Sequence, residues 1–304
     1  MGEMTVGVAQ RAPLPYDNPV EQFALDVAST LNRHPEIELL VYPEMHLCGT
    51  EHLPEAARPA ALEAAAVALE SELVDSLGSI ARSHGIWLCP GSIGETTPDG
   101  AFANTQLLFD PSGRLRAAYR KMFPWRPFEP HRPGTEFVVQ PLDDETVAAG
   151  RSETDEHPTV GLSICYDAWF PEHSRQLAWL GADVVLNIVK TTSPDREQEL
   201  VLARANAIVN QNFVVSVNCA GPIGRGRSII VGPEGFVMAE AGIGEETLVV
   251  AVDRDHVTDV RTRGTMGTNR IWHQFQPGDT EIPLPAYNGR IDPQNWSPRE
   301  PRTH

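Results

Sequence analysis

Cys165 stands where a nucleophile is expected in an α/β enzyme, between a predicted strand and a predicted helix. The apolar run 159–164 reads as a buried strand, and a helix is expected to begin near Pro171. A thiol on such a turn points out of the sheet edge, where helix N–H dipoles favour the thiolate and lower its pKa. The N–H groups that follow it can hold an oxyanion. Cysteine is also commonly a small buried apolar residue, so its position alone leaves that alternative open.

Two charged residues at other strand ends could assist such a nucleophile. Glu44 directly follows a predicted strand and Pro43. A carboxylate at the carboxyl end of a strand in an α/β protein can act as a general base. Lys121 ends another strand and enters an aromatic loop, where partial desolvation would let its ammonium act on a nearby anion. Taken singly, Glu44 is better explained as an exposed loop acid, and Lys121 as a surface lysine whose side chain lies over apolar neighbours.

The elements that must position these residues follow from hydrophobic periodicity. Short apolar runs predict strands at 5–9, 38–42, 86–89, 105–109, 115–119, 159–164, 183–189, 213–217 and 247–252. Helical spacing predicts helices near 18–32, over the Ala-rich stretch 58–84, from about 171 to 180 and over 195–210. Turn sequences at 110–113 and 232–235 predict two hairpins. This mixture fits a layered α/β sandwich, although pattern alone does not choose it over a doubly wound sheet.

The domain organisation is expected to be simple. No linker-like break appears before about residue 275, so we expect one domain over residues 1–275. Residues 142–157 carry Asp, Glu and Gly and are interpreted as an exposed connection. The Pro-rich tail 276–304 lacks periodicity, and it is either disordered or packed on a partner subunit.

Composition excludes several classes of partner. The net charge of −17 argues against binding to nucleic acid or to an anionic membrane surface, because both need a basic face. No run approaches the ~18 apolar residues of a transmembrane helix, and the first residues lack the pattern of a signal peptide. The cysteines show no CxxC pair and are expected to be free thiols: Cys48, Cys89, Cys165 and Cys219. We therefore expect a cytoplasmic protein.

The candidate residues lie in segments that resemble the nitrilase-like carbon–nitrogen hydrolase superfamily. Tyr42-Pro43-Glu44 resembles its general-base segment, and Tyr119-Arg120-Lys121-Met122 resembles its lysine segment. The stretch 161–172, GLSICYDAWFPE, closely resembles its nucleophile segment, and residues 7–10, 204–207 and 232–235 match further positions. The resemblance covers roughly residues 4–275. It implies an αββα sandwich of the nitrilase type, a four-layer arrangement in a single domain.

The resemblance also implies the role of each residue. Glu44 would take the proton of Cys165, while Lys121 and the backbone N–H of Tyr166 would stabilise the oxyanion. Water activated by the same glutamate would hydrolyse the resulting thioester. The frame 121–129, KMFPWRPFE, resembles the aliphatic amidase and formamidase branch, in which Glu129 would orient the lysine or the substrate. No metal or other cofactor is expected, because the sequence has no HExxH and no paired CxxC.

The sequence narrows the substrate only partly. Members that act on N-carbamoyl amino acids usually carry arginines just after the nucleophile, whereas this chain has YDAW at 166–169, which disfavours an anionic substrate. Trp125, Tyr166 and Trp169 are expected to wall a compact, mostly apolar pocket, with core or dimer packing nearly as good an explanation for Trp169. A small neutral amide is the first hypothesis. A carbamoyl-amide hydrolase or a nitrilase is the second, and a non-catalytic scaffold on the same fold is the third.

Two further expectations concern His46 and assembly. If the segment after Glu44 is extended, His46 shares a face with it and permits a Cys–His pairing. We favour for His46 a structural role or one in supporting the catalytic residues, because the resemblance already supplies a base. The resemblance also implies a homodimer or a larger even assembly, formed through the helix after Cys165 and the C-terminal region. Trp169, Trp179, Trp272 and the tail could supply its apolar anchors.

Overall fold

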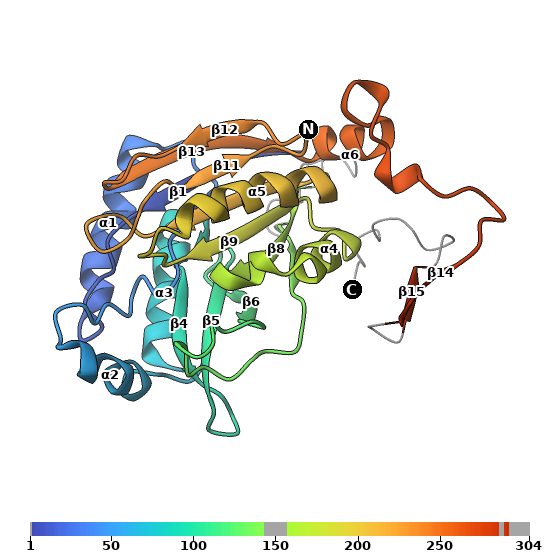
Figure 1. Cartoon of the computed structure of the whole chain (residues 1–304). Helices are drawn as coiled ribbons and strands as arrows, with labels where there is room; N and C mark the ends of the chain where they lie inside the picture. Colours follow the sequence, from blue (N-terminus) through green and yellow to red (C-terminus); the bar gives the residue numbers. More distant parts are fainter. Residues whose placement is uncertain (1, 143–156, 286–288, 292–304) are drawn as a thin grey trace.

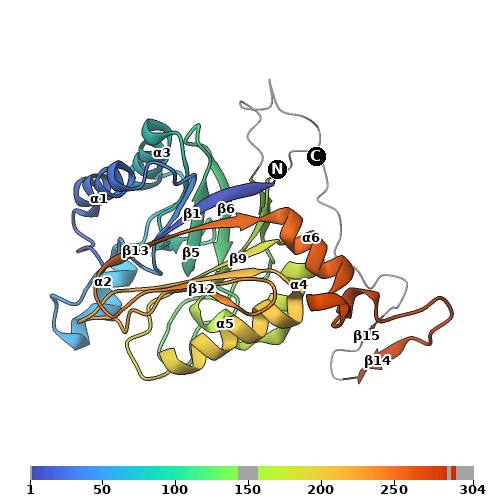
Figure 2. The ribbon, with the colours of Figure 1, turned by 90° about the horizontal axis from the view of Figure 1, so that it is seen from above.

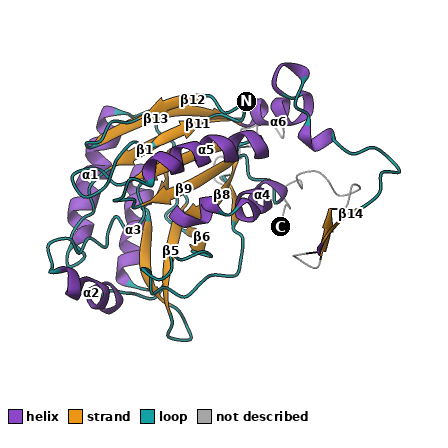
Figure 3. Cartoon of the chain, in the orientation of Figure 1, coloured by secondary structure: helices purple, strands orange, loops and turns teal. Residues whose placement is uncertain are grey.

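Two mixed β-sheets lie face to face at the centre of the molecule, and helices cover the outer face of each sheet (Figures 1 and 2). The computed structural model describes residues 2–142, 157–285 and 289–291. Figure 3 shows the strands of both sheets between the helical layers. The predicted αββα sandwich is therefore confirmed.

The first sheet carries the N-terminal half of the chain and one late strand. Its order is β13-β1-β2-β3-β5-β4, with β6 paired to β5. The strands are β1 (Glu3–Gln10), β2 (Leu39–Val41), β3 (Trp87–Cys89), β4 (Ser92–Thr96), β5 (Phe102–Phe109), β6 (Leu115–Arg120) and β13 (Glu246–Asp253). Strands β1, β2 and β3 are parallel, so their carboxyl ends open on one edge. Glu44 follows β2 at this edge.

The second sheet carries the nucleophile segment. Its order is β12-β11-β10-β9-β8-β7. The strands are β7 (Val139–Pro141), β8 (Thr159–Ile164), β9 (Val184–Val189), β10 (Phe213–Asn218), β11 (Ile229–Val231) and β12 (Val237–Glu240). Strands β8, β9 and β10 are parallel and buried at every residue, which explains their nearly continuous apolar sequences. Cys165 follows β8, and Lys190 follows β9.

Helices close both outer faces of the sandwich. Helices α1 (Pro19–Arg33) and α3 (Glu72–His84) cover the first sheet, and α4 (Pro171–Trp179) and α5 (Arg196–Asn210) cover the second (Figure 2). Helix α1 begins with Pro19. Proline has no backbone N–H, but N–H groups in the first turn of a helix have no acceptor within the helix, so no hydrogen bond is lost. Helix α3 is capped by the residue that follows it, Gly85, which adopts the left-handed conformation with a φ of 64°.

Buried apolar side chains form one layer between the sheets and one under each pair of helices. Val6 and Val8 of β1 belong to the same central cluster as Leu162 and Ile164 of β8. A second cluster joins α1 and α3 to the first sheet, and a third joins α4 and α5 to the second. The strand ends that carry Glu44 and Cys165 are thus held by a shared core, which positions them relative to each other.

The predicted helix over 58–84 is wrong in its middle. The structure has α2 (Arg58–Ala64) and α3, separated by residues 65–71. There the backbone of Val67 bridges to β4: its N–H donates to the Gly94 carbonyl at 3.0 Å, and its carbonyl accepts from Thr96 at 2.9 Å. Alanine-rich composition favours helix, but sheet-edge pairing by a β-branched residue overrides that propensity.

Other elements were not predicted. These are β4, β7 and α6 (Arg254–Arg263), which follows β13. The predicted exposed connection 142–157 falls almost entirely on residues 143–156, which lie outside the described residues. Part of the predicted tail forms a small hairpin of β14 (Ile282–Leu284) and β15 (Gly289–Ile291). Across the described parts of the chain, every helix is too short or too polar to span a bilayer.

Candidate active site

The turn that carries Cys165 joins β8 to a short 3-10 helix, Cys165–Trp169. Cys165 itself has a φ of 47°, a left-handed conformation that is rare for residues other than glycine. Asp167 supports the turn, because its Oδ2 accepts the N–H of Ile164 at 2.9 Å. Tyr166 lies in the first turn of this helix, where N–H groups lack intrahelical acceptors. The sharp turn thus presents the thiol at the strand end, as the sequence predicted.

Glu44 is buried at the end of the β2 segment, with 3% of its surface exposed. Its Oε1 accepts hydrogen bonds from Asn104 Nδ2 at 2.8 Å and from Lys121 Nζ at 3.1 Å. Its Oε2 accepts the backbone N–H of Lys190 at 2.9 Å. Donors from both sheets therefore fix the carboxylate, and the interpretation of Glu44 as a solvated loop acid is excluded.

Lys121 is fully buried just after β6, between two carboxylates. Its Nζ lies 3.1 Å from Glu44 Oε1 and 2.8 Å from Glu129 Oε1. Burial by itself lowers the pKa of Lys121, but the two carboxylates outweigh burial and hold the pKa above its ordinary value. The ammonium is therefore charged at neutral pH, and the interpretation as a surface lysine is excluded.

Glu129 reaches Lys121 from the aromatic loop. Its Oε2 accepts the N–H of Trp125 at 3.2 Å, and His131 Nδ1 lies 3.8 Å from the same oxygen. Burial opposes ionisation of Glu129, yet His131 and Lys121 together lower its pKa to about 2. The predicted fourth polar residue thus lies in contact with the lysine, as an ionised carboxylate at neutral pH.

The expected lowering of the Cys165 pKa is wrong. Burial raises the pKa of the thiol well above its ordinary value, the Glu44 charge raises it further, and Lys121 only partly opposes them. The carboxylates of Glu199 and Glu129 also raise the pKa of this thiol. The resting group is therefore a thiol, and a nearby base must accept its proton for it to react.

These residues surround one cavity of about 330 Å³. Glu44, Glu129 and Cys165 line it together with the three predicted aromatic residues, Trp125, Tyr166 and Trp169. Most of its lining surface is apolar, as expected, and polar side chains of residues 190–193, Asp195 and Glu199 also line it. Within the described ranges there is no group of three or more His, Cys, Asp or Glu residues arranged to hold a metal ion.

His46 does not share a face with Glu44. The segment turns at Met45, whose φ is 52°, and His46 packs against Tyr42, with ring centroids 4.9 Å apart. Neither ring nitrogen of His46 has a hydrogen-bond partner among the described residues. Burial lowers the pKa of His46 to about 3, so the ring is neutral. The structural role that we favoured for this residue agrees with its packing.

Sequence reasoning missed three groups that hold the site together. Asn104 lies inside β5 in the polar run Asn104-Thr105-Gln106, and this buried polar run was the available signal. The Lys190 N–H gave no signal, because its role depends on where β9 ends beside Glu44. Asp167 lies within the recognised nucleophile segment, but its contacts with Tyr119 Oη at 2.7 Å and the Phe123 N–H at 2.9 Å depend on the packing of the two sheets.

Comparison with known proteins agrees with this fold. The "Carbon-nitrogen hydrolase" family model matches residues 5–262. A crystal structure of an amidase from Nesterenkonia sp. superposes with a TM-score of 0.66 at 26% identity, covering 86% of this chain and 95% of that one. Nit3 from Saccharomyces cerevisiae, a member of the nitrilase superfamily, has a TM-score of 0.74 at 23% identity, covers 90% of this chain and 97% of that one, and supports the fold alone.

Curated relatives match over part of their length. A Formamidase from Pseudomonas syringae pv. tomato is 32% identical over 71% of this chain and 60% of its own, so the match spans less than two thirds of that relative. A 2-oxoglutaramate amidase from Paenarthrobacter nicotinovorans is 36% identical over 65% of this chain and 68% of its own. The family model covers most of the chain and includes the strand ends that carry Glu44, Lys121 and Cys165. The chain belongs to the carbon–nitrogen hydrolase family, within the nitrilase superfamily.

Proposed function

We propose that this protein hydrolyses the C–N bond of a small neutral amide, with Cys165 as nucleophile, Glu44 as general base and Lys121 as oxyanion donor. One observation carries the proposal: a fully buried lysine bridges Glu44 and Glu129 beside the cavity that Cys165 enters. Isolated buried charges are strongly unfavourable, so an arrangement of this kind is typical of a catalytic site.

The first half of the reaction forms a thioester. Glu44 takes the thiol proton as Cys165 Sγ bonds to the amide carbonyl carbon. The negative charge on the carbonyl oxygen is held by Lys121 Nζ and by the backbone N–H of Tyr166. Glu44 then returns the proton to the amide nitrogen, the C–N bond breaks, and ammonia leaves from a primary amide. Because the pKa of the thiol is raised, the proton moves from Cys165 to Glu44 during the attack, and no thiolate forms beforehand.

The second half releases the acid. Water enters the cavity, Glu44 takes one of its protons, and the oxygen attacks the thioester carbonyl. The C–S bond then breaks, and the proton returns to Cys165 Sγ. Glu129 accepts a hydrogen bond from Lys121 at 2.8 Å and so fixes the direction in which the ammonium points. Trp125, Tyr166 and Trp169 would enclose the acyl group of the substrate.

The charges around the cavity support a neutral substrate. Both lysines that line or border it are paired, Lys121 with Glu44 and Glu129, and Lys190 with Glu51 at 2.6 Å. A substrate carboxylate would therefore find no free cation at these positions. A formamidase relative and the Nesterenkonia amidase, solved as a mutant in complex with butyramide, are consistent with this choice. A carbamoyl-amide hydrolase or nitrilase would use the same residues.

We also propose that the enzyme is cytoplasmic and homodimeric. All four cysteines are free thiols, as is usual in a reducing compartment. The net charge of −17 supports a protein without nucleic-acid or membrane partners.

The test is ammonia release from a panel of neutral amides, carbamoyl compounds and nitriles by the wild type and by Cys165→Ala. Release from a neutral amide that disappears in the variant is expected. Release from carbamoyl compounds or nitriles alone would overturn the substrate choice. A non-catalytic scaffold would release nothing, and its Cys165 would react with a thiol probe no faster than the three buried cysteines.

A further inference from the structure

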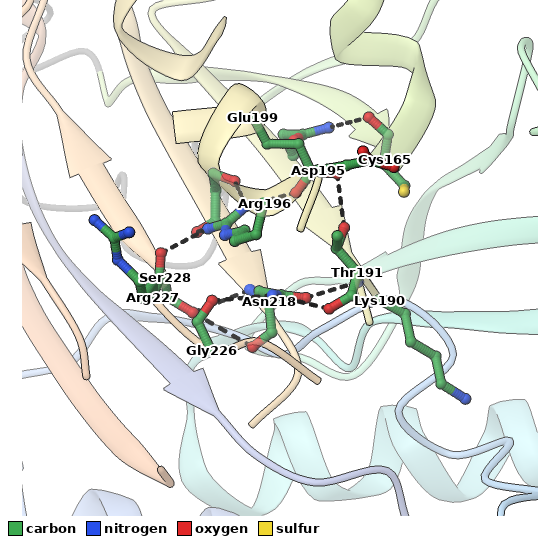
Figure 4. Close-up of polar contacts among 12 residues, drawn as sticks. Cys165, Lys190, Thr191, Asp195, Arg196, Glu199, Asn218, Gly226, Arg227 and Ser228 are labelled. Carbon is green, nitrogen blue, oxygen red and sulfur yellow. Dashed lines mark hydrogen bonds and ion pairs between the residues drawn. The ribbon is translucent and has the colours of Figure 1, made fainter. Parts of the chain in front are cut away.

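A third carboxylate, Glu199 of α5, lines the same cavity as Cys165 (Figure 4). Only 6% of Glu199 is exposed, and no step proposed above uses it. Its Oε1 accepts a hydrogen bond from Thr191 Oγ1 at 2.6 Å, and its Oε2 accepts one from Arg196 Nη1 at 3.0 Å. The carboxylate is therefore held from two sides in the wall of the cavity that Cys165 also lines.

Arg196 belongs to a buried network that anchors Glu199 to the second sheet. Arg196 is 1% exposed, and it donates to Ser216 Oγ at 3.0 Å and to the Arg227 carbonyl at 2.7 Å. A buried ion pair is seldom more stabilising than apolar packing of the same volume. A contribution to stability alone therefore does not explain why the Arg196–Glu199 ion pair lies beside the cavity.

Thr191, the second partner of Glu199, is fixed in the same way. Its N–H donates to Asn218 Oδ1 at 2.8 Å, and Asn218 Nδ2 donates to the Gly226 carbonyl at 2.9 Å (Figure 4). Rigid support of this kind is what a group needs if it is to recognise one part of a ligand. Glu199 therefore has the surroundings of a binding group.

The two oxygens of Glu199 keep acceptor capacity for a ligand. A carboxylate oxygen can accept about two hydrogen bonds, and each Glu199 oxygen accepts one from the described protein. Asp195, which precedes α5, lines the cavity on the same side and adds a second carboxylate. This wall of the cavity therefore favours hydrogen-bond donors and disfavours carboxylates.

We propose that Glu199 is a specificity-determining residue that accepts a hydrogen bond from an O–H or N–H group on the acyl part of the substrate. The preferred substrates are then small amides that carry a hydroxyl or amino group near the scissile carbonyl, in place of purely aliphatic or carboxylated amides. The inference rests on the proposed amidase function and names its substrate class.

The test compares lactamide with propionamide, two neutral amides that differ by one hydroxyl group, and includes succinamate as an anionic amide. A hydrogen bond to a charged group predicts a kcat/KM for lactamide about 10- to 100-fold above that for propionamide, with succinamate below both. Glu199→Gln is expected to lower the lactamide-to-propionamide ratio about 10-fold or more. Glu197→Gln makes the same change on an exposed residue of α5 that does not line the cavity, and it should keep the wild-type ratio.

The ratio separates recognition from a merely structural role. If Glu199 only supported Arg196, its substitution would lower both rates together and leave the ratio unchanged, which would overturn the inference. A wild-type ratio close to one would overturn it without any variant, so poor folding of Glu199→Gln does not prevent a decision. Hydrolysis of both amides at equal rates would leave the proposed amidase function intact, whereas hydrolysis of no amide at all would overturn both.

Discussion

At the residue scale, the candidate site is a set of charges that depend on one another. Glu44, Lys121 and Glu129 are buried or nearly buried, and each is satisfied mainly by the others and by a few fixed donors. The sequence predicted these residues because each lies in a recognisable motif. It could not predict Asn104 or the Lys190 N–H, since their contacts with Glu44 join segments far apart in the chain.

Removing Lys121 should therefore destabilise the fold as well as abolish activity. Lys121→Met leaves two carboxylates without their cation, and we expect the free energy of unfolding to fall by about 3–5 kcal/mol. Adding Glu129→Gln removes one of the uncompensated charges, so the double variant should be more stable than the sum of the single effects implies. Urea unfolding at pH 7 measures this coupling, and strictly additive losses would contradict it.

His46 should make stability sensitive to acid. Burial holds its pKa at about 3 in the folded state, below the value of 6.5 usual for an exposed histidine. The unfolded chain therefore binds a proton that the folded chain does not, and stability falls as pH drops from about 6.5 toward 3. In His46→Leu, the free energy of unfolding should fall less steeply between these pH values, with a slope smaller by up to about 1.4 kcal/mol per pH unit. If the free energy of unfolding changed with pH in the same way for the wild type and His46→Leu, His46 would not be a neutral buried ring in the folded state.

At the element scale, Asp167 ties the turn after β8 to the segment after β6. One oxygen accepts the Ile164 N–H and the Tyr119 hydroxyl, and the other accepts the Phe123 N–H. This arrangement fixes the nucleophile turn relative to the lysine segment. No local pattern predicts such a link, because it forms only when the two sheets pack.

Asp167→Asn should loosen that link. An amide retains one acceptor oxygen, so at least one buried donor loses its partner, and we expect destabilisation of about 1–3 kcal/mol. The value of kcat should fall more than KM changes, since the turn that holds Cys165 shifts relative to Lys121. Tyr119→Phe leaves the Ile164 and Phe123 N–H groups bonded to Asp167 and removes only the hydroxyl, with its contacts to Met122 N–H and His173, so it serves as a comparison. Equal kinetics for wild type and Asp167→Asn would argue against a positioning role.

The sequence predicts the strands that are buried along their whole length. It does not predict elements that depend on contacts between segments far apart in the chain. Strands β8, β9 and β10 are nearly continuous apolar runs, and the sequence predicts their bounds to within one residue. The Ala-rich stretch predicts one helix, because its interruption at Val67 arises only from pairing with β4. Strand β4 itself, SIGET, has too few apolar residues to stand out.

At the scale of the whole molecule, the sandwich brings strand ends from two sheets to one cavity. The sequence pattern allowed two α/β architectures, and the family resemblance selected the correct one. Exposed apolar residues remain on the outer face of α5 and on the turn between β11 and β12: Val201, Ile208, Val209 and Phe236. We propose these residues as the dimer surface in place of the C-terminal region, because the expected anchor Trp272 is buried within the chain, with 6% of its surface exposed.

Two charges placed on this patch should weaken the dimer. We expect sedimentation velocity to show a dimer for the wild type and a larger monomer fraction for Val201→Asp/Ile208→Asp, because burying aspartate at an apolar interface is unfavourable. Leu25→Asp on α1 is a control, since Leu25 is as exposed as Val201, at 66%. A monomeric wild type, or a dimer indifferent to both changes, would rule out this surface as the interface.

The most direct test of the proposed chemistry is to trap the acyl-enzyme and map its position. Wild-type protein mixed with a hydrolysed amide, quenched in acid during turnover and digested, should yield the peptide containing Cys165 with the added mass of the acyl group. The thioester should be absent from the peptides of Cys48, Cys89 and Cys219, whose thiols are buried, and from all peptides of Cys165→Ala. Amide hydrolysis that continues in Cys165→Ala, or an acyl group found on another cysteine, would contradict Cys165 as the nucleophile.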